Sequence, residues 1–348
     1  MKKPFSLLCA ALLSAGLLSG CGAETPPAAS GGDTDNTPLE SIVFTEPVRG
    51  YHWAPAYLAQ TLGYFADEGL DAEFLTVSGA DSSTPVFTGD AQFGLRGVEM
   101  ALMSNEAGQG CKILVSTTGR YPYQLIGANE NYGTVESLRG QTVAGGQGPS
   151  SAPQAFIKAI LLHGDIIPVE ETAVISMASA GYLAALSKGE IQAAVSTNPW
   201  SARQLLDAGG VVIVDGADEA AMEDLMGTST YELFTIFTSD AYIAENPETV
   251  QKTVNAIARA IDWMNEASSE EIAKNLEPLF EGQYDELLFS AEADQERGLH
   301  TATGYHTESG FAAALALTKL SGGISGDLPA EKIYDESFLQ NAWAAIEK

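Results

Sequence analysis

Two tryptophans, one arginine and a segment rich in glycine and serine are the residues of this chain best suited to binding a small molecule. Trp53 and Trp200 offer large flat rings that can enclose a planar or apolar body. Arg96 follows an apolar run, and its guanidinium can hold a carboxylate or sulfonate through two hydrogen bonds. The segment 145–153 adds backbone freedom and hydroxyl groups. Together these types predict a solute with a planar or apolar body and at least one anionic or strongly polar group.

The segment 145–153 is the strongest candidate for holding that polar group. Its glycines let a ligand approach the backbone closely, and Ser150 or Ser151 can cap the helix that Pro153 starts. Free N–H groups at a helix start attract negative charge. The segment is not a phosphate-binding P-loop, because no Gly-Lys-Ser/Thr follows it. A plain loop with a helix cap is the alternative that stays open.

Short apolar runs alternate with helical patterns and predict the scaffold that carries these residues. Candidate strands lie at 41–45, 71–77, 91–95 and 112–117, then at 142–145, 172–176, 192–196 and 211–214. Candidate helices between them include 54–66, 98–106, 153–163 and 182–187. This alternation is typical of an α/β fold with parallel strands. Residues 88–95 and 188–195 share a pattern of glycine, acidic residue and apolar strand, which favours two similar lobes, although chance can also produce so common a connection.

The loops that follow the predicted strands should carry the binding residues, because ligands of open α/β sheets bind beyond the carboxyl ends of the strands. The expected ligand contacts are Tyr51, His52, Trp53, Arg96, Gly97, Gln147, Ser150, Ser151, Asn198, Trp200 and Tyr231. Ordinary structural roles remain as alternatives. Either tryptophan can belong to the core, Arg96 can form a surface ion pair, and His52 can be a plain loop residue.

Composition limits the partners and the chemistry. The chain has 348 residues, of which 46 are acidic and 17 basic, giving a formal net charge of −29. Such a surface repels phosphate backbones, so no nucleic-acid partner is expected. The histidines at 52, 163, 300 and 306 lack the spacing of a metal site, and no catalytic triad can be assembled from the sequence. We therefore expect no metal, no cofactor and no enzymatic activity.

The N-terminus predicts export and a lipid anchor. Lys2 and Lys3 precede an uncharged apolar stretch, 5–18, that has the length of a signal-peptide core and is short for a membrane span. Leu18-Ser19-Gly20-Cys21 resembles the bacterial lipobox, which implies cleavage before Cys21 and a lipid on its sulfur. Residues 1–20 would be the lipoprotein signal peptide and 21–38 a disordered tether. An ordinary signal peptide with an incidental cysteine is the alternative.

One longer segment resembles a known family. Residues 54–71, APAYLAQTLGYFADEGLD, resemble the signature of the nitrate, sulfonate, taurine and thiamine-precursor binding proteins of bacterial ABC importers. The two glycine–acid–strand elements and residues 136–143 match further segments of that family, although Gln92 and Gln192 replace its usual aspartates. The resemblance runs from about Ile42 to Trp263. It is specific for the superfamily and weak for the ligand.

The resemblance implies a two-lobed periplasmic-binding-protein type II fold, in which each lobe is a mostly parallel sheet flanked by helices and the cleft lies between the lobes. Residues 39–127 and 235–348 would form lobe I, and 128–234 lobe II. The protein would be an extracytoplasmic, lipid-anchored monomer that captures a small organic solute for ABC permease and ATPase subunits. The expected solutes are sulfonates, aromatic carboxylates or thiamine-type pyrimidines.

Two other functions stay open at this point. The first is an enzyme of the same fold, of the kind that acts in thiamine-pyrimidine or menaquinone synthesis. Such enzymes are cytosolic by family expectation, so the lipobox argues against this function. The second is a lipoprotein that senses a solute without transporting it. Neighbouring genes for a permease and an ATPase would distinguish an importer component from such a sensor.

Overall fold

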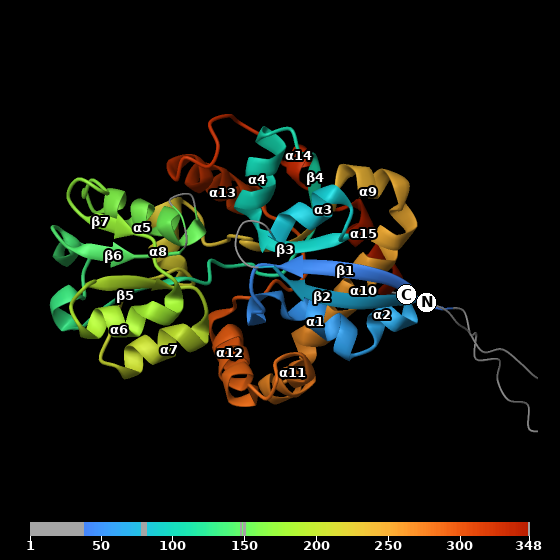
Figure 1. Cartoon of the computed structure of the whole chain (residues 1–348), viewed down its shortest axis with the longest axis horizontal. Helices are drawn as coiled ribbons and strands as arrows, with labels where there is room; N and C mark the ends of the chain where they lie inside the picture. Colours follow the sequence, from blue (N-terminus) through green and yellow to red (C-terminus); the bar gives the residue numbers. More distant parts are fainter. Residues whose placement is uncertain (1–37, 78–81, 147, 149–150, 347–348) are drawn as a thin grey trace, which may run out of the picture. The chain divides into compact units, whose positions relative to one another are not determined.

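The computed structural model describes residues 38–77, 82–146, 148 and 151–346, which build an α/β fold around two five-stranded sheets (Figure 1). The first sheet has the order β2-β1-β3-β10-β4 and the second the order β7-β6-β8-β5-β9. The strands of the first sheet are β1 (Glu40–Glu46), β2 (Leu70–Thr76), β3 (Phe93–Gly97), β4 (Cys111–Ser116) and β10 (Phe234–Ser239). Those of the second are β5 (Gln124–Gly127), β6 (Thr142–Ala144), β7 (Ala173–Ile175), β8 (Ala193–Ser196) and β9 (Val211–Asp215).

Each sheet is parallel except for one strand in its fourth position. β1 pairs with β2 and β3 in parallel, whereas β10 runs antiparallel to both β3 and β4. In the second sheet β6 pairs with β7 and β8 in parallel, and β5 runs antiparallel to β8 and β9. The expected fold of two mostly parallel sheets flanked by helices is therefore confirmed.

The repeated glycine–acid–strand pattern has the same structural role in both sheets. The Gln92 side chain, just before β3, accepts a hydrogen bond from the backbone N–H of Val43 in β1 at 2.8 Å. The Gln192 side chain, just before β8, accepts one from the backbone N–H of Thr142 in β6 at 3.0 Å. Each glutamine thus ties the third strand of its sheet to the second, in place of the aspartate that the resemblance leads one to expect.

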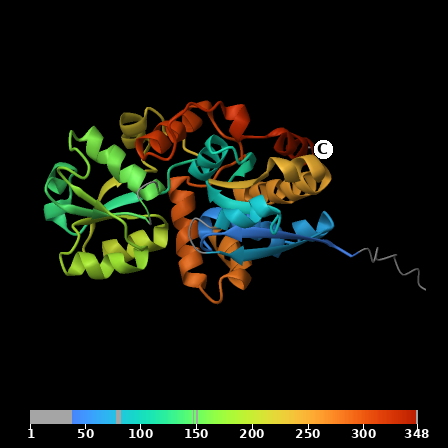
Figure 2. The ribbon, with the colours of Figure 1, turned by 45° about the horizontal axis from the view of Figure 1, so that its top comes forward.

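Helices cover the sheets on both faces (Figure 2). α10 (Pro247–Glu266) is the longest, and it packs against α1 (Ala54–Thr61), α2 (Tyr64–Asp67) and α15 (Ser337–Ile346). The other helical elements are η1 (Tyr51–Trp53), α3 (Thr84–Thr88), α4 (Val98–Glu106), η3 (Glu130–Tyr132), η4 (Glu136–Leu138), α5 (Ala152–His163), η5 (Ser179–Gly181), α6 (Tyr182–Ser187), α7 (Pro199–Asp207), α8 (Glu219–Met226), α9 (Asp240–Glu245), α11 (Ser269–Leu276), η6 (Glu277–Leu279), α12 (Tyr284–Arg297), α13 (Glu308–Leu320) and α14 (Ala330–Ile333). No helix among the described residues is long and apolar enough to cross a membrane.

The signature segment builds the core of the first sheet's helical layer. The expected helix 54–66 divides into α1 and α2 at Gly63, whose φ of 80° is the left-handed conformation that favours glycine. Tyr57 and Phe65 are buried, and Phe65 packs on Phe44 of β1 with ring centroids 5.6 Å apart. Tyr64 is only half-buried, with the guanidinium of Arg259 lying 4.1 Å from its ring centroid. These residues secure the fold.

One strand lies in a different sheet from the one that the sequence implied. The expected first lobe ran to residue 127, yet β5 (Gln124–Gly127) pairs with β8 and β9 of the second sheet. The chain therefore leaves the first sheet after β4, through residues 117–123, and it returns between β9 and β10. The sequence reasoning missed β5 because a run of four residues carries little periodicity.

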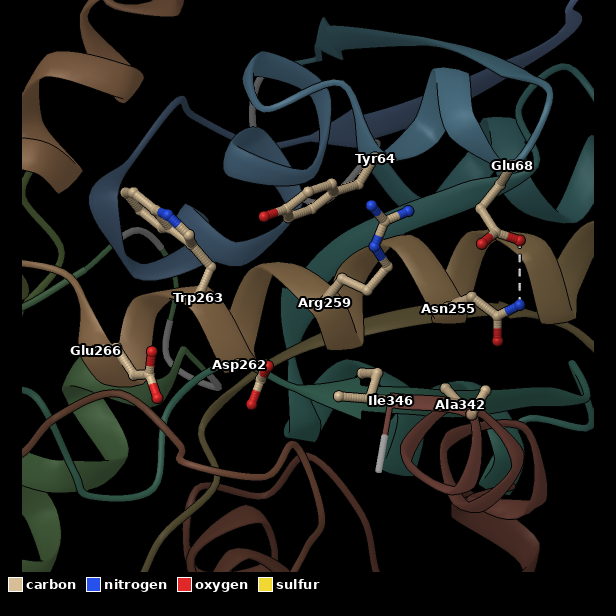
Figure 3. A pocket seen from close by; sticks show the side chains of 10 residues that line it. Tyr64, Glu68, Asn255, Arg259, Asp262, Trp263, Glu266, Ala342 and Ile346 are labelled. Carbon is tan, nitrogen blue, oxygen red and sulfur yellow. Dashed lines mark hydrogen bonds between the residues drawn. The ribbon is translucent and has the colours of Figure 1, made fainter. Parts of the chain in front are cut away.

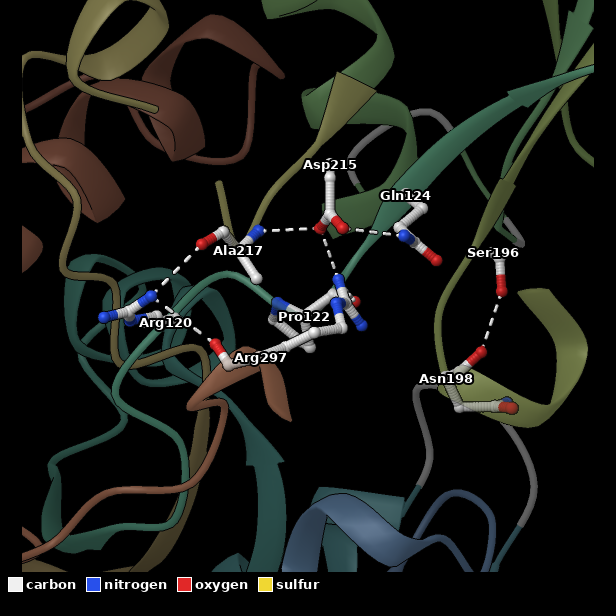
Figure 4. Close-up of polar contacts among 8 residues, drawn as sticks. All are labelled: Arg120, Pro122, Gln124, Ser196, Asn198, Asp215, Ala217 and Arg297. Atoms are coloured by element: carbon white, nitrogen blue, oxygen red, sulfur yellow. Dashed lines mark hydrogen bonds and ion pairs between the residues drawn. The ribbon is translucent and has the colours of Figure 1, made fainter. Parts of the chain in front are cut away.

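A hydrogen-bond network joins the two crossings to α12 (Figure 4). Arg297 Nη2 donates to Asp215 Oδ1 at 2.5 Å and to the carbonyl of Pro122 at 3.3 Å. Asp215 also accepts from Gln124 Nε2 at 2.8 Å and from the backbone N–H of Ala217 at 2.9 Å. One partly buried carboxylate thereby collects donors from both crossings and from α12.

Replacing Asp215 by alanine should lower the free energy of unfolding by roughly 1–3 kcal/mol, because Arg297, Gln124 and the Ala217 N–H all lose their acceptor. Urea unfolding measures this. Glu190→Ala is the matched control, since Glu190 pairs with Lys188 at 3.9 Å on the surface and should change stability by less than about 0.5 kcal/mol. Equal effects of the two variants would show that the crossing network does not stabilise the fold.

Candidate ligand-binding site

A pocket of about 940 Å³ is lined by residues from the loops of both sheets. The first sheet contributes the loop after β1, η1, α3 and the junction of β3 with α4. The second contributes the loop after β6 with the start of α5, residues 178–180, and Thr197 after β8. The volume lies in the range of pockets that enclose small organic ligands.

Five of the expected ligand contacts line this pocket: His52, Trp53, Arg96, Gly97 and Ser151. Four others lie elsewhere, namely Tyr51, Asn198, Trp200 and Tyr231. Gln147, Ser150 and the expected lipid-bearing Cys21 fall outside the described residues. The rule that ligands bind beyond the strand ends thus found the loops on both sides of the pocket.

The four residues that lie elsewhere have structural contacts. Tyr51 donates its hydroxyl to Asp294 at 3.3 Å. Asn198 caps α7 by accepting from the N–H of Ser201 at 2.8 Å. Tyr231 is 2% exposed, and its ring stands perpendicular to that of Tyr121 at 4.6 Å.

Trp200 packs on α12 rather than in the pocket. Its ring meets that of Phe289 edge-on at 5.9 Å, and the Arg203 guanidinium lies 4.7 Å from the Phe289 ring centroid. The expected sandwich of a solute between two tryptophans therefore does not describe this pocket, where Trp53 has other aromatic partners.

An aromatic wall forms around Phe234, the first residue of β10. His52 stacks on Phe234 with ring centroids 3.9 Å apart and planes at 14°, and Trp53 meets Phe234 edge-on at 5.2 Å. Tyr123 also lines the pocket, with its ring 6.2 Å from that of Phe234. Burial lowers the pKa of His52 to about 3, so this imidazole is neutral at physiological pH. The wall is thus aromatic and uncharged.

The sequence reasoning missed Phe234 and Tyr123 for a topological reason. Apart from Tyr231, it considered only residues that follow a strand. β10 is antiparallel to its neighbours, so its first residue lies at the edge where the parallel strands end. Tyr123 precedes β5, the reversed strand of the second sheet, and the same argument applies. An aromatic residue just before a strand that runs antiparallel to its neighbours is the sequence signal that could have found both residues.

A buried carboxylate positions η1, which carries His52 and Trp53. Glu46, the last residue of β1, is fully buried and accepts hydrogen bonds from Arg49 Nε at 2.9 Å, from Thr76 Oγ1 at 2.8 Å and from the Tyr57 hydroxyl. Arg49 donates further to the carbonyls of Phe74 and Leu279, each at 3.1 Å. These bonds fix the turn that leads from β1 into the aromatic wall.

Among the described residues of the lining, one side chain is positive, Arg96, and one is negative, Glu99. Arg96 Nη1 donates to Ser82 Oγ at 2.7 Å, and burial lowers the Arg96 pKa while the Glu99 charge raises it. Burial raises the pKa of the Glu99 carboxyl, and its own backbone N–H and the Arg96 charge lower it. The lining therefore offers a guanidinium and a carboxylate close to a neutral aromatic wall.

On the opposite side, the start of α5 lines the pocket. Ser151 occupies the N-cap position in extended conformation, as the sequence predicted, but its hydroxyl donates to the carbonyl of Gly148 at 2.8 Å and does not cap the helix. The Gly148 N–H donates to Ser176 Oγ at 3.1 Å. Gly148 is thus held by Ser151 and by the residue after β7, and the start of α5 keeps donors that the Ser151 side chain does not cap.

A second pocket of about 440 Å³ lies between α2, α10 and α15 (Figure 3). Several of its polar side chains are already engaged: Asn255 Nδ2 donates to Glu68 at 3.1 Å, and Arg259 bonds Asp67, outside the lining, at 2.8 Å beside the Tyr64 ring. Across the described parts of the chain, no group of three or more His, Cys, Asp or Glu side chains is placed to hold a metal ion. The larger pocket is the better candidate for a ligand.

Comparisons with known proteins agree with the fold. Residues 51–271 match the model of the family described as NMT1/THI5 like. A protein of Bacillus subtilis (strain 168), described as the putative binding protein YtlA, is 23% identical over 251 residues, which cover 70% of this chain and 72% of that protein.

Two solved structures share the fold at low identity. A putative sulfonate ABC transporter periplasmic sulfonate-binding protein, SsuA of Methylobacillus flagellatus KT, aligns with a TM-score of 0.68 and 15% identity over 89% of this chain and 96% of that one. The desulfurization enzyme DSZB, in complex with biphenyl-2-sulfinic acid, aligns with a TM-score of 0.65 and 16% identity over 88% and 99%. At these identities the likeness establishes the fold alone. The family match covers more than half of the chain, and this protein belongs to the NMT1/THI5-like family.

Proposed function

We propose that this protein is an extracytoplasmic solute-binding lipoprotein that captures a small organic solute and delivers it to an ABC importer. The observation that carries the proposal is the pocket of about 940 Å³, which joins an uncharged aromatic wall to a guanidinium and the start of α5. The relatives support it, since one is described as a putative binding protein and another as a periplasmic sulfonate-binding protein.

The pocket fits a solute with a flat or apolar body and a polar end. The body would lie against Trp53, Phe234 and His52, where ring contacts contribute without charge. An anionic group would meet Arg96 or the start of α5. Sulfonates, aromatic carboxylates and thiamine-type pyrimidines fit this description. A bare nitrate ion fits less well, because it would leave the aromatic wall uncovered.

Binding by closure of two lobes is part of the proposal. Lobe I would comprise residues 39–123 and 234–348 and lobe II residues 124–233, because β5 pairs in the second sheet and β10 in the first. Hinge motion would occur at the two crossings, where Arg297 and Asp215 meet. The pocket is lined from both sheets, so closure would enclose the solute.

An enzyme of the same fold remains the rival, since DSZB shares the architecture. Cys111 is the remaining thiol if Cys9 is removed and Cys21 carries lipid. It is buried, and its pKa is raised to about 12, chiefly by burial, so it carries no thiolate at neutral pH. A buried, protonated thiol is a poor nucleophile. The pocket lining, in contrast, has aromatic and polar contacts suited to holding a solute, and both observations favour capture over turnover.

Arg96→Ala should weaken solute binding by at least about 1 kcal/mol, because the guanidinium is the positive side chain of the pocket lining. Calorimetry should use the solute recovered from natively purified protein and identified by mass spectrometry. Recovery of that solute unaltered after prolonged incubation distinguishes a binder from an enzyme. Arg139→Ala, which removes a surface partner of Glu171, should leave the affinity unchanged. Wild-type affinity in Arg96→Ala would place the anion site elsewhere.

Cys21→Ala should release the protein from the membrane fraction of a bacterium that processes lipoproteins, because the lipid has no sulfur to join. Immunoblots of membrane and soluble fractions measure this. Cys9→Ala, in the apolar stretch before the lipobox, should fractionate like the wild type. Membrane retention of Cys21→Ala would contradict the anchor.

Binding of the identified solute should reduce the radius of gyration, because closure brings the two lobes together. Small-angle X-ray scattering with and without saturating solute measures the change. Arg96→Ala, saturated at a higher solute concentration, should contract by the same amount if occupancy of the pocket drives closure. An unchanged radius at verified saturation would contradict closure.

A further inference from the structure

Two buried polar atoms of the pocket lining have no hydrogen-bond partner among the described residues. They are the indole donor Nε1 of Trp53 and the carboxylate acceptor Oε2 of Glu99. Trp53 is only 1% exposed. Leaving such groups unpaired is costly, and folded proteins rarely do so without a reason. Here one donor and one acceptor lie in the lining of the same pocket.

The local structure makes room for the Glu99 carboxylate. Glu99 is the second residue of α4, and its side chain folds back over Gly97 at the end of β3. A Cβ at Gly97 would lie 2.2 Å from Glu99 Oε2, so any other residue at position 97 would displace the carboxylate. The space that holds the Glu99 carboxylate thus depends on glycine at position 97.

Arg96 attracts the Glu99 carboxylate through its charge, but no hydrogen bond between the two side chains satisfies Oε2. His52 is neutral, so it supplies no charge. Arg96 is the basic side chain of the lining, and its Nη1 is already engaged with Ser82. A solute that is only an anion would be repelled by Glu99 and would leave its Oε2 unpaired. A solute that brings a donor nitrogen would satisfy it.

We propose that Glu99 and Trp53 select a solute that presents an N–H donor to the carboxylate and a hydrogen-bond acceptor to the indole N–H. The inference rests on the proposed function and narrows its solute class. Aminosulfonates, amino-substituted aromatic carboxylates and aminopyrimidines carry both groups, whereas simple sulfonates carry only acceptors. Any anionic group of such a solute would still meet Arg96, so the lining holds complementary partners for a zwitterion.

Matched probe pairs that differ by one amino group test the proposal. The pairs are taurine with ethanesulfonate, 4-aminobenzoate with benzoate, and 4-amino-2-methylpyrimidine with 2-methylpyrimidine, each titrated by calorimetry. In at least one pair the amino member should bind the wild type at least tenfold more tightly than its partner. Glu99→Gln should reduce that preference at least tenfold, and Trp53→Phe should weaken the preferred probe severalfold while keeping an aromatic ring.

The stability of the ligand-free variants separates selection from a structural role. Oε2 has no hydrogen-bond partner to lose, and relief of the buried charge offsets the lost attraction to Arg96, so Glu99→Gln should melt near the wild-type temperature while its preference falls. A marked loss of stability would assign Glu99 a structural role and overturn the proposal. Glu190→Gln, the same change of carboxylate to amide at a surface residue outside the pocket, should keep both stability and preference.

The outcomes distinguish the two levels of inference. If the simple member binds as tightly as its amino partner in every pair that binds, the role of Glu99 and Trp53 is overturned and the proposed function stays intact. If Glu99→Gln keeps the wild-type preference for the amino probe, the role of Glu99 is likewise overturned and the proposed function stays intact. Failure of all six probes to bind overturns the proposed solute classes together with the inference that depends on them.

Discussion

The buried carboxylate of Glu46 is the interaction on which the pocket depends. It lies at the end of the first strand, and it gathers donors from the following turn, from α1 and from β2. A buried charge is stable only when such partners surround it, so the turn has one acceptable path. That path delivers His52 and Trp53 to the edge of the sheet, where Phe234 completes the aromatic wall. Loss of the Glu46 partners would therefore disturb the pocket without removing any residue from it.

Charge in this protein acts on two scales. The net charge of −29 creates a field that repels anions at long range, and salt screens that field over about 10 Å at 0.1 M ionic strength. Inside the pocket the local pair of Arg96 and Glu99 sets the interaction, in surroundings where water no longer weakens it. Under the proposal above, affinity depends on whether the solute carries groups that complement both Arg96 and Glu99. The field outside the pocket influences chiefly the rate at which a charged solute arrives.

The sequence predicted the fold class and five of the residues that line the pocket, and the reasons why it missed the others are physical. Strand–helix alternation identified the two sheets, and the strand-end rule found His52, Trp53, Arg96, Gly97 and Ser151. The rule selects loops, but it does not say which way a side chain on a following helix turns. Trp200 is the example: it stands at the start of α7, whose contact with α12 draws the ring to Phe289. Glu99 escaped notice because a glutamate in the first turn of a helix ordinarily serves the helix dipole at the surface.

The position of β10 has a consequence for how the chain acquires its structure. This strand lies between β3 and β4, yet it follows all five strands of the second sheet in the sequence. As the chain emerges from its N-terminus, the first sheet lacks an inner member until about residue 239, and β3 and β4 each keep an open edge. The second sheet comes from one continuous stretch, 124–215, and meets no such delay. The order in which the chain emerges therefore favours folding of the second sheet before the first. The first sheet is completed only when β10 inserts between β3 and β4.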